Sequence, residues 1–434
     1  MKKKFYSFFI LLVLASFNFQ CKQESSTINT PQPPGNPVNP DPVTANLQGN
    51  VVDENGNPAS GVTVQVGAKT TTSNANGFFR IEQAGLDKQS SVVTVQKNGY
   101  FKAYRSFCAT NGTNQVEIKL VKKTNAGTIA SASGGTVTLP DGTKITLPAA
   151  GVVKQGSTTA YSGNILVYAT YLDPSSADIS QTIPGSMMGD DKNGNRTTLQ
   201  SFGLISVELE SAAGEKLQMA TGKKAQLTVA IPSSLQTSAP STISMWYVDE
   251  QTGIWKEEGT ATKTGTNYVG EVSHFTFWGL NVSGPAVLLT ATLKNAQNVL
   301  LPYTTVRIKR MVNGVANYGM AITDSLGQVS GLVPKDVVMD FQVMDYCSNI
   351  AYSQSIGPFT ANTSLSVINA NIPANYSLMV KGTAVNCNGQ PIANAQVTVT
   401  RNYQQWYLRT NSTGEFQLNT LHCGTGNVTV QAHD

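Results

Sequence analysis

Side chains that could act as catalysts or metal ligands are scarce in this chain. It has only three histidines among 434 residues, at positions 274, 422 and 433. No two of them have the spacing that places zinc ligands on one helix or strand. The sequence therefore contains no motif for a metal-dependent hydrolase, and it predicts neither a metal nor a cofactor.

Two acidic stretches have the composition of a binding or catalytic site. "GDDKNGN" (189–195) is rich in oxygen ligands, but Gly194 comes too early for a calcium loop of the EF-hand type and no acid follows at the required distance. Glu257 and Glu258 are adjacent, and neighbouring strand residues point to opposite faces, so they would not converge on a glycosidic bond. We interpret both stretches as turns on the surface.

Aromatic side chains gather in "RNYQQWYLR", where Tyr403, Trp406 and Tyr407 could stack on sugars or peptides. The alternative is that they form cross-strand pairs within a sheet.

Cys21 follows three lysines and an apolar run from Phe5 to Phe17. The run has the length of a secretion signal and falls short of the roughly 20 residues that span a bilayer. The arrangement resembles a bacterial lipoprotein signal, which implies a diacylglycerol on the Cys21 thiol and a membrane anchor of several acyl chains. Gln20 departs from that pattern, which has a small residue there, and the alternative is plain secretion.

The other cysteines are Cys108, Cys347, Cys387 and Cys423, and disulfides are allowed in an exported chain. A Cys387–Cys423 bond would lie within one repeat, although strand order places these two residues at opposite ends of it. Cys347–Cys423, between repeats, is the alternative, and Cys108 could be a buried thiol. The sequence does not choose among these pairings.

The elements that carry these residues are expected to be strands. Charged residues make up 13% of the chain, against about 25% in a typical domain, and small polar residues and Val replace them. Without the three N-terminal lysines the chain has 27 basic against 26 acidic residues, a net charge of +1, which indicates no nucleic-acid partner. Six prolines from Pro31 to Pro42 predict an extended linker after Cys21.

A short motif occurs twice, at 49–66 and 382–399. In both copies a turn glycine comes seven residues after the first glycine, then a proline, then three apolar residues at alternate positions. A later glycine stands two residues before Phe79 in one copy and before Phe416 in the other. A weaker third copy, with "LPYTTVRI" (301–308) and "TDSLGQV" (323–329), lacks the Asn-Gly of the first turn. Such alternation predicts half-buried strands joined by tight turns.

These motifs resemble the carboxypeptidase regulatory-like domain, a transthyretin-like seven-stranded β-sandwich. The resemblance covers about 46–122 and 376–434, and more weakly 286–375. It implies a fold rather than an activity, because the name comes from an accessory domain of metallocarboxypeptidases, and we expect no enzyme. The last copy lacks two strands that the first contains, so we expect a truncated module that is either a fragment or completed by a partner.

Residues 127–280 follow another pattern. An Asp-Gly turn within 134–152 predicts a hairpin. Trp246, Trp255 and "HFTFW" (274–278) resemble the β-sandwich domain of cartilage intermediate layer protein and, more distantly, of ankyrins and netrin receptors. In those proteins the domain is a scaffold and an interaction surface.

The wider group also implies one reaction, because some members cut themselves at His-Phe-Ser. Here the Thr276 hydroxyl would attack the Phe275 carbonyl, with His274 assisting proton transfer. The alternative is a strand whose Phe275 and Phe277 face the core, with His274 beside it.

The sequence thus predicts an all-β chain of tandem β-sandwich modules. The expected segments are a signal peptide (1–20), a lipid-anchored proline-rich linker (21–45), a carboxypeptidase regulatory-like sandwich (46–122), a cartilage intermediate layer protein-like sandwich (124–284), a degenerate transthyretin-like sandwich (285–375) and a last, truncated sandwich (376–434). We expect a non-enzymatic lipoprotein on the outer-membrane surface that binds an unknown protein or glycan or serves as a scaffold. The alternatives are self-processing at Phe275–Thr276, an accessory binding subunit of an outer-membrane nutrient uptake system, and a periplasm-facing or secreted location.

Overall fold

The computed structural model describes residues 40–434 except 177, 313–314, 346, 348, 373–376, 402–403, 423–425 and 434. Regular structure in this part is almost entirely β-strand, apart from α1 (Ile179–Thr182) and a 3-10 turn at Ser233–Leu235. The all-β prediction is confirmed. Within the described ranges, no helix has the length and apolarity to cross a bilayer. The predicted signal peptide and Cys21 lie outside the described residues.

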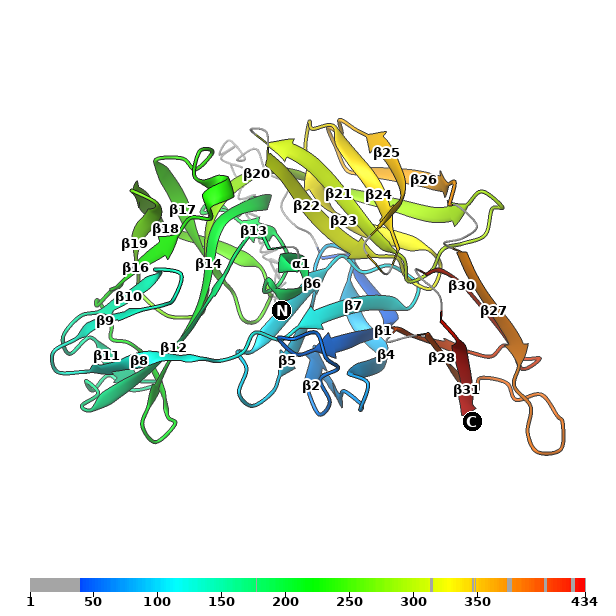
Figure 1. Ribbon diagram of the computed structural model, residues 1–434, viewed down its shortest axis with the longest axis horizontal. Coiled ribbons are helices and arrows are strands. Elements are labelled where there is room, and N and C mark those ends of the chain that lie inside the picture. The colour runs from blue at the N-terminus through cyan, green and yellow to red at the C-terminus, as the bar shows by residue number, and fades with distance from the viewer. Residues whose placement is uncertain are drawn as a thin grey trace, which may run out of the picture. The chain divides into compact units, whose positions relative to one another are not determined.

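We name the folded segments module A (46–122), the middle domain (124–284), module B (285–375) and module C (376–434), which follow one another from blue to red in Figure 1. Module A is a sandwich of a three-stranded and a four-stranded sheet. The first contains β4 (Phe78–Asp87), β1 (Pro42–Val52) and β7 (Asn114–Lys119), and the second β3 (Lys69–Thr72), β2 (Thr63–Val66), β5 (Ser91–Gln96) and β6 (Ala103–Phe107). β1 begins at Pro42, inside the segment expected to be linker, where only β4 pairs with it and a proline is tolerated.

Module B has the same topology as module A, so the weak third copy of the motif is a full sandwich. One sheet contains β23 (Gln328–Pro334), β20 (Phe277–Asn295) and β26 (Thr363–Ala370), and the other β22 (Val315–Ile322), β21 (Thr305–Val312), β24 (Met339–Met344) and β25 (Ile350–Ile356). As β1 does in module A, β20 pairs antiparallel with one neighbour and parallel with the other.

Module C has two strands in one sheet and three in the other among its described residues. These are β27 (Ser377–Thr383) with β30 (Glu415–Leu421), and β29 (Gln404–Arg409), β28 (Gln396–Arg401) and β31 (Val428–His433). Val93 and Val95 of β5 are fully buried in module A, whereas Val428 and Val430 of β31 are 36% and 41% exposed. The inner face of β31 is therefore only partly covered by the described residues.

The strands of the middle domain form one hydrogen-bonded ladder that folds over a main core. They are β8 (Asn125–Ala130), β9 (Gly135–Thr138), β10 (Lys144–Leu147), β11 (Val152–Lys154), β12 (Asn164–Leu172), β13 (Met188–Asp190), β14 (Arg196–Ser211), β15 (Lys216–Met219), β16 (Ala225–Ala230), β17 (Thr242–Val248), β18 (Trp255–Thr264), β19 (Asn267–Val272) and the first half of β20. The predicted hairpin is the antiparallel pair β9–β10, with Gly142 at a φ of 90°.

One strand belongs to two folding units. The 19 residues of β20 pair with β14 up to Pro285 and with β23 from Ala286 onward. The middle domain and module B therefore share a continuous strand and have no loop between them.

Tight turns throughout the chain use one side-chain motif. In six described turns an Asp or Asn accepts hydrogen bonds from the backbone N–H groups two and four residues later, and a glycine three residues later donates to its carbonyl. The first residues of these turns are Asp53, Asn74, Asp191, Asp324, Asn386 and Asn411. In module B, Asn298 takes the place of the glycine at a φ of 63°, a conformation that Asn tolerates.

A buried hydroxyl precedes the second of these turns in each repeated module. Ser73, Thr323 and Thr410 are at most 5% exposed. Each hydroxyl accepts a hydrogen bond from a backbone N–H at 2.8–2.9 Å and donates one to a carbonyl at 2.6–2.7 Å. This hydroxyl bridge joins the two turn regions of each module.

Apolar contacts join the modules. Trp246 and Trp255 do not belong to the main core of the middle domain but form a junction core with Phe101 and Tyr104 of module A. Tyr303 of module B packs into the core of module C. The modules are therefore held together by packed junctions.

Candidate functional site

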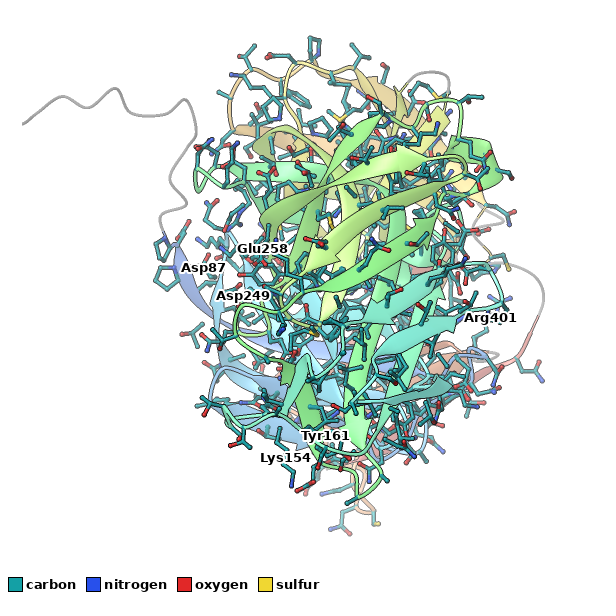
Figure 2. All side chains as sticks on the ribbon, turned by 90° about the vertical axis from the view of Figure 1, so that its left-hand side faces the viewer. Asp87, Lys154, Tyr161, Asp249, Glu258 and Arg401 are labelled. Carbon is teal, nitrogen blue, oxygen red and sulfur yellow. The ribbon has the colours of Figure 1, made fainter. Side chains whose placement is uncertain are left out.

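The predicted His274–Thr276 stretch is a bend between β19 and β20. The His274 ring packs edge-on against Tyr247, with ring centroids 4.6 Å apart, and lies 5.1 Å from the Trp278 ring. Its Nε2 is 3.5 Å from Glu258 Oε2, and Glu258 also accepts a hydrogen bond from Ser273. Glu258 is labelled on this face of the middle domain in Figure 2. The imidazole is thus partnered by an acid and two aromatic rings.

The Phe275–Thr276 peptide bond is fixed by a residue that sequence reasoning missed. Gln218 of β15 accepts from the Phe275 N–H and donates to the Phe275 carbonyl, both at 3.0 Å. The donated bond lies where an oxyanion would form if that carbonyl were attacked. Phe275 itself is 4% exposed, within the core. Gln218 belongs to no sequence motif that includes residues 274–276, so its contact with Phe275 becomes visible only in the folded chain.

The nucleophile and base of the self-cleavage hypothesis are not brought together in the same way. The Thr276 hydroxyl donates to the Phe277 carbonyl at 3.1 Å, on the C-terminal side of the bond it would attack. The described hydrogen bonds of this region include none between His274 and Thr276. The geometry supplies a hydrogen-bond donor to the Phe275 carbonyl but no activated hydroxyl, and self-cleavage stays an untested alternative.

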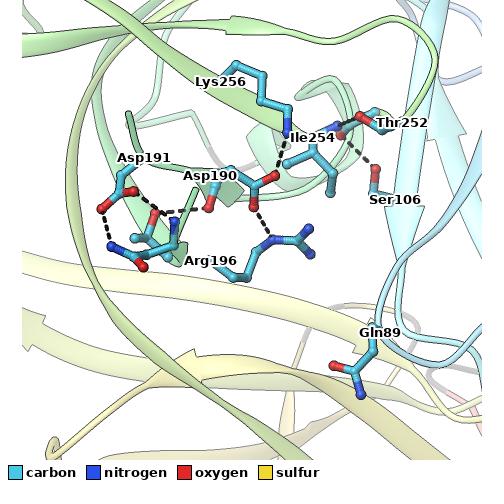
Figure 3. Close-up of polar contacts among 12 residues, drawn as sticks. Gln89, Ser106, Asp190, Asp191, Arg196, Thr252, Ile254 and Lys256 are labelled. Carbon is cyan, nitrogen blue, oxygen red and sulfur yellow. Dashed lines mark hydrogen bonds and ion pairs between the residues drawn. The ribbon is translucent and has the colours of Figure 1, made fainter. Parts of the chain in front are cut away.

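The acidic stretch at 189–195 consists of the end of β13, where Asp190 is ion-paired, and an Asx turn that follows it. One carboxylate oxygen of Asp191 accepts from two backbone N–H groups, and the other from the Asn195 amide. Asp190 accepts hydrogen bonds from Arg196 Nε and Lys256 Nζ (Figure 3), and both donor–acceptor distances are 2.5 Å. Burial disfavours the charged carboxylate of Asp190, but the hydrogen bonds from these two cations outweigh it and lower its pKa. Both acids therefore serve the structure.

Glu257 and Glu258 have separate partners. Glu257 accepts from the Lys192 backbone N–H at 3.0 Å and from the Ser244 hydroxyl at 2.6 Å, whereas Glu258 faces Ser273 and His274. The two carboxyls do not converge, as the alternation of strand side chains predicts.

The aromatic residues of module C are packing residues. Trp406 is 1% exposed in the core of module C. Tyr407 is 4% exposed and stacks on Phe78 of module A, with ring centroids 3.3 Å apart. Stacking of a ligand on these two side chains is therefore excluded by burial. Tyr403 lies outside the described residues.

The structure decides against one of the candidate cysteine pairings. Cys347 is disulfide-bonded, whereas Cys108 is a buried free thiol and Cys387 an exposed free thiol. The Cys387–Cys423 bond is thus wrong, because Cys387 follows the end of β27 that pairs with Glu415, while Leu421 pairs with the opposite end. Cys423 lies outside the described residues, as does Cys21.

Two hollows of the surface contain ion-paired side chains. A hollow of about 450 Å³ is lined by Lys224 and Glu271, which are ion-paired at 3.4 Å. Another of about 240 Å³, where module A meets α1, contains the 2.6 Å pair of Lys119 and Asp178. In the part of the chain that the structure describes, no three His, Cys, Asp or Glu residues are grouped to hold a metal ion.

Comparison with solved structures finds pilins and adhesins at low identity. A streptococcal ancillary pilin is 11% identical, with 46% of this chain and 92% of that chain covered and a TM-score of 0.17. The full-length major pilin SpaD of Corynebacterium diphtheriae is 9% identical, with 76% and 98% covered and a TM-score of 0.17. A Ca²⁺-stabilised ice-binding adhesin of an Antarctic bacterium is 13% identical, with 90% and 97% covered and a TM-score of 0.10.

Comparison of the sequence identifies the repeats. No curated protein matches the chain. The likeness of the middle domain to cartilage intermediate layer protein stays a prediction. Residues 46–121 and 379–434 match the family model of the carboxypeptidase regulatory-like domain. Two segments of this all-β chain, in modules A and C, are therefore similar to the carboxypeptidase regulatory-like domain.

Proposed function

We propose that this protein is a non-enzymatic surface lipoprotein, anchored through Cys21, whose joined modules hold binding surfaces away from the membrane. The partner is a protein or a glycan outside the cell. The proposal combines the lipoprotein-like start of the sequence with the architecture of the described residues.

The ionisable groups support a binding or scaffold role. The carboxylates of the predicted sites, Asp190, Glu257 and Glu258, are each engaged by neighbouring side chains or backbone groups. An acid–base catalyst needs a group free to reach substrate in a cleft. These acids stabilise loops and strands.

The continuous strand β20 carries the proposal most directly. Because it joins the middle domain to module B without a loop, and because junction cores join module A to the middle domain and module C to module B, the protein is built as a stiff frame. Such a frame keeps exposed loops and edges in fixed positions, which suits a protein that presents surfaces to a partner.

Anchoring is tested by expressing the full chain in a Gram-negative host with a clickable palmitate analogue. We expect label on the wild type, none on Cys21→Ser, and release of the folded part when intact cells are treated with protease. An unlabelled wild-type protein, or one protected from protease on intact cells, would overturn the anchored surface location.

Binding is tested with beads that carry the full-length protein, exposed to host cell-wall material, extracellular matrix proteins and soluble oligosaccharides. Retention on matrix or cell-wall material supports the proposal. Uptake of small soluble oligosaccharides alone would instead favour the nutrient-system alternative.

A further inference from the structure

The hairpin formed by the second and third strands of each repeated module differs in length among the three modules. Its strands are four residues long in module A (β2–β3), six in module C (β28–β29) and eight in module B (β21–β22). In module B the pairing of β21 with β24 ends at Lys309, whereas its pairing with β22 continues to Val312. The end of this hairpin therefore projects beyond the sheet, in a module whose topology otherwise matches module A.

The projecting hairpin exposes a contiguous apolar patch. Val306 of β21 is buried in the core, so residues 307, 309 and 311 occupy the outer face. Tyr318 lies opposite Lys309, and Met320 opposite Arg307. Met311, Tyr318 and Met320 are 56%, 51% and 43% exposed. Met320 also accepts a hydrogen bond from Ser180 of α1, so the patch reaches the middle domain.

The same hairpin is cationic. Arg307 and Lys309 lie on the outer face and Arg310 on the opposite face, all within four residues of a chain in which charged residues are only 13%. Among the described residues, the carboxylate that pairs with them is Asp340, 3.7 Å from Lys309. Arg307 donates to the neutral amide of Gln342. Among the described residues, the face therefore keeps one cation, Arg307, without a carboxylate partner, beside exposed methionine and tyrosine.

We propose that this hairpin face (residues 307, 309, 311, 318 and 320) docks a protein segment that presents an apolar side chain flanked by carboxylates. This inference rests on the proposed function, and it adds which surface binds the partner and which chemical groups the partner presents. Methionine, tyrosine and arginine are the residue types enriched where proteins meet, and a cation such as Arg307, which donates to a neutral amide, favours an acidic partner.

The geometry favours a protein over a glycan. The Arg307 guanidinium lies over the Tyr318 ring, 4.6 Å from its centroid. This cation–π contact covers the ring face that a sugar would need for stacking. The methionines offer flexible apolar contact to a side chain, whereas a polyanionic glycan would engage only the cations.

The probe is a random copolymer of glutamate and tyrosine, titrated against the full-length protein at 150 mM salt. Poly-glutamate, alginate and phosphatidylglycerol vesicles are titrated in parallel. The test variant is Lys309→Gln/Met311→Ser. Its matched control is Met379→Ser/Lys381→Gln, which removes the same pair of side-chain types from β27, where Met379 is 62% exposed. Because all four side chains lie on the surface, circular dichroism should give unchanged melting curves.

We expect the copolymer to bind at least tenfold more tightly than poly-glutamate, the hairpin variant to lose at least tenfold in affinity, and the control to stay within twofold. Equal losses in the two variants, or copolymer binding no tighter than that of poly-glutamate, would refute the inference. Hairpin-dependent binding of alginate or vesicles would also refute it, in favour of a glycan or membrane partner. If the hairpin variant loses nothing while beads still retain matrix material, this inference fails and the proposed function stands.

Discussion

The hydroxyl bridge gives the sharpest stability prediction, and Thr323→Val is the variant that tests it. The Thr323 hydroxyl accepts from the Thr304 N–H at 2.8 Å and donates to the Leu301 carbonyl at 2.7 Å, at a position with no exposed surface. Valine has nearly the same shape but neither donor nor acceptor, so the substitution removes two hydrogen bonds without opening a cavity.

The expected cost follows from the two groups left without partners. A buried backbone group that loses its hydrogen bond costs about 1–3 kcal/mol. Two such groups, with partial relaxation, give a loss of about 2–4 kcal/mol in the local stability of module B. Since 1.4 kcal/mol is a factor of ten, protection of the Thr304 amide against hydrogen exchange should fall roughly 30-fold to 1,000-fold.

Hydrogen exchange is the suitable assay, because a chain of several modules does not unfold in two states. Thr323→Ser is the control, since it keeps the hydroxyl and loses one methyl group. Peptides from β2 of module A serve as an internal reference and should exchange at the wild-type rate. Equal protection of Thr304 in the Val and Ser variants would refute the assigned role of the hydroxyl.

Further outcomes follow from the site and the junctions. Hydrogen bonds from Tyr100 and Lys122 lower the pKa of Glu54 to about 2, so its stabilising effect is complete above about pH 4.5 and is lost as the pH falls toward 2; Glu54→Gln should flatten the pH dependence of the melting temperature in that window. Tyr303→Ala should cost about 3–5 kcal/mol and make module C sensitive to trypsin, whereas the exposed Tyr318→Ala should not. Intact mass should show no cut at Phe275–Thr276 and no change in Thr276→Ala, and a fragment pair ending at Phe275 would contradict this. A non-reducing peptide map should place Cys347 in a disulfide-linked peptide, and we expect Cys423 as its partner, because Leu421 packs in the core of module B.

The repeats were predictable where backbone geometry demands particular residues. Gly49 is needed because a Cβ there would lie 2.8 Å from the Phe79 ring, and Gly382 stands in the same relation to Phe416. In module B, Ala291 lies opposite Val329. Alanine is larger than the glycine of the other modules, and valine is smaller than their phenylalanine. The sequence motif of module B is weak because both residues of this pair, the glycine and the phenylalanine, are replaced there.

The junctions could not be predicted, because they depend on residues with no fixed spacing. Trp246 and Trp255 were recognised as distinctive, but their packing against module A requires the fold. Tyr303 and Gln218 gave no signal in the sequence. The burial of Tyr407 could not be predicted, because alternation indicates which face of a strand points inward within one module and not whether another module, here through Phe78, covers the outer face.

The shared strand β20 determines how the protein would respond to force. Nine of its positions pair with β14 or β17 and the next seven pair with β23 in module B, so a pull along the strand loads many hydrogen bonds in shear at once. Bonds loaded together resist far better than bonds opened one by one at an unzipping end. Force applied to a ligand bound by module B would thus be transmitted along β20 into the middle domain. The junctions that depend on packed side chains alone would separate first.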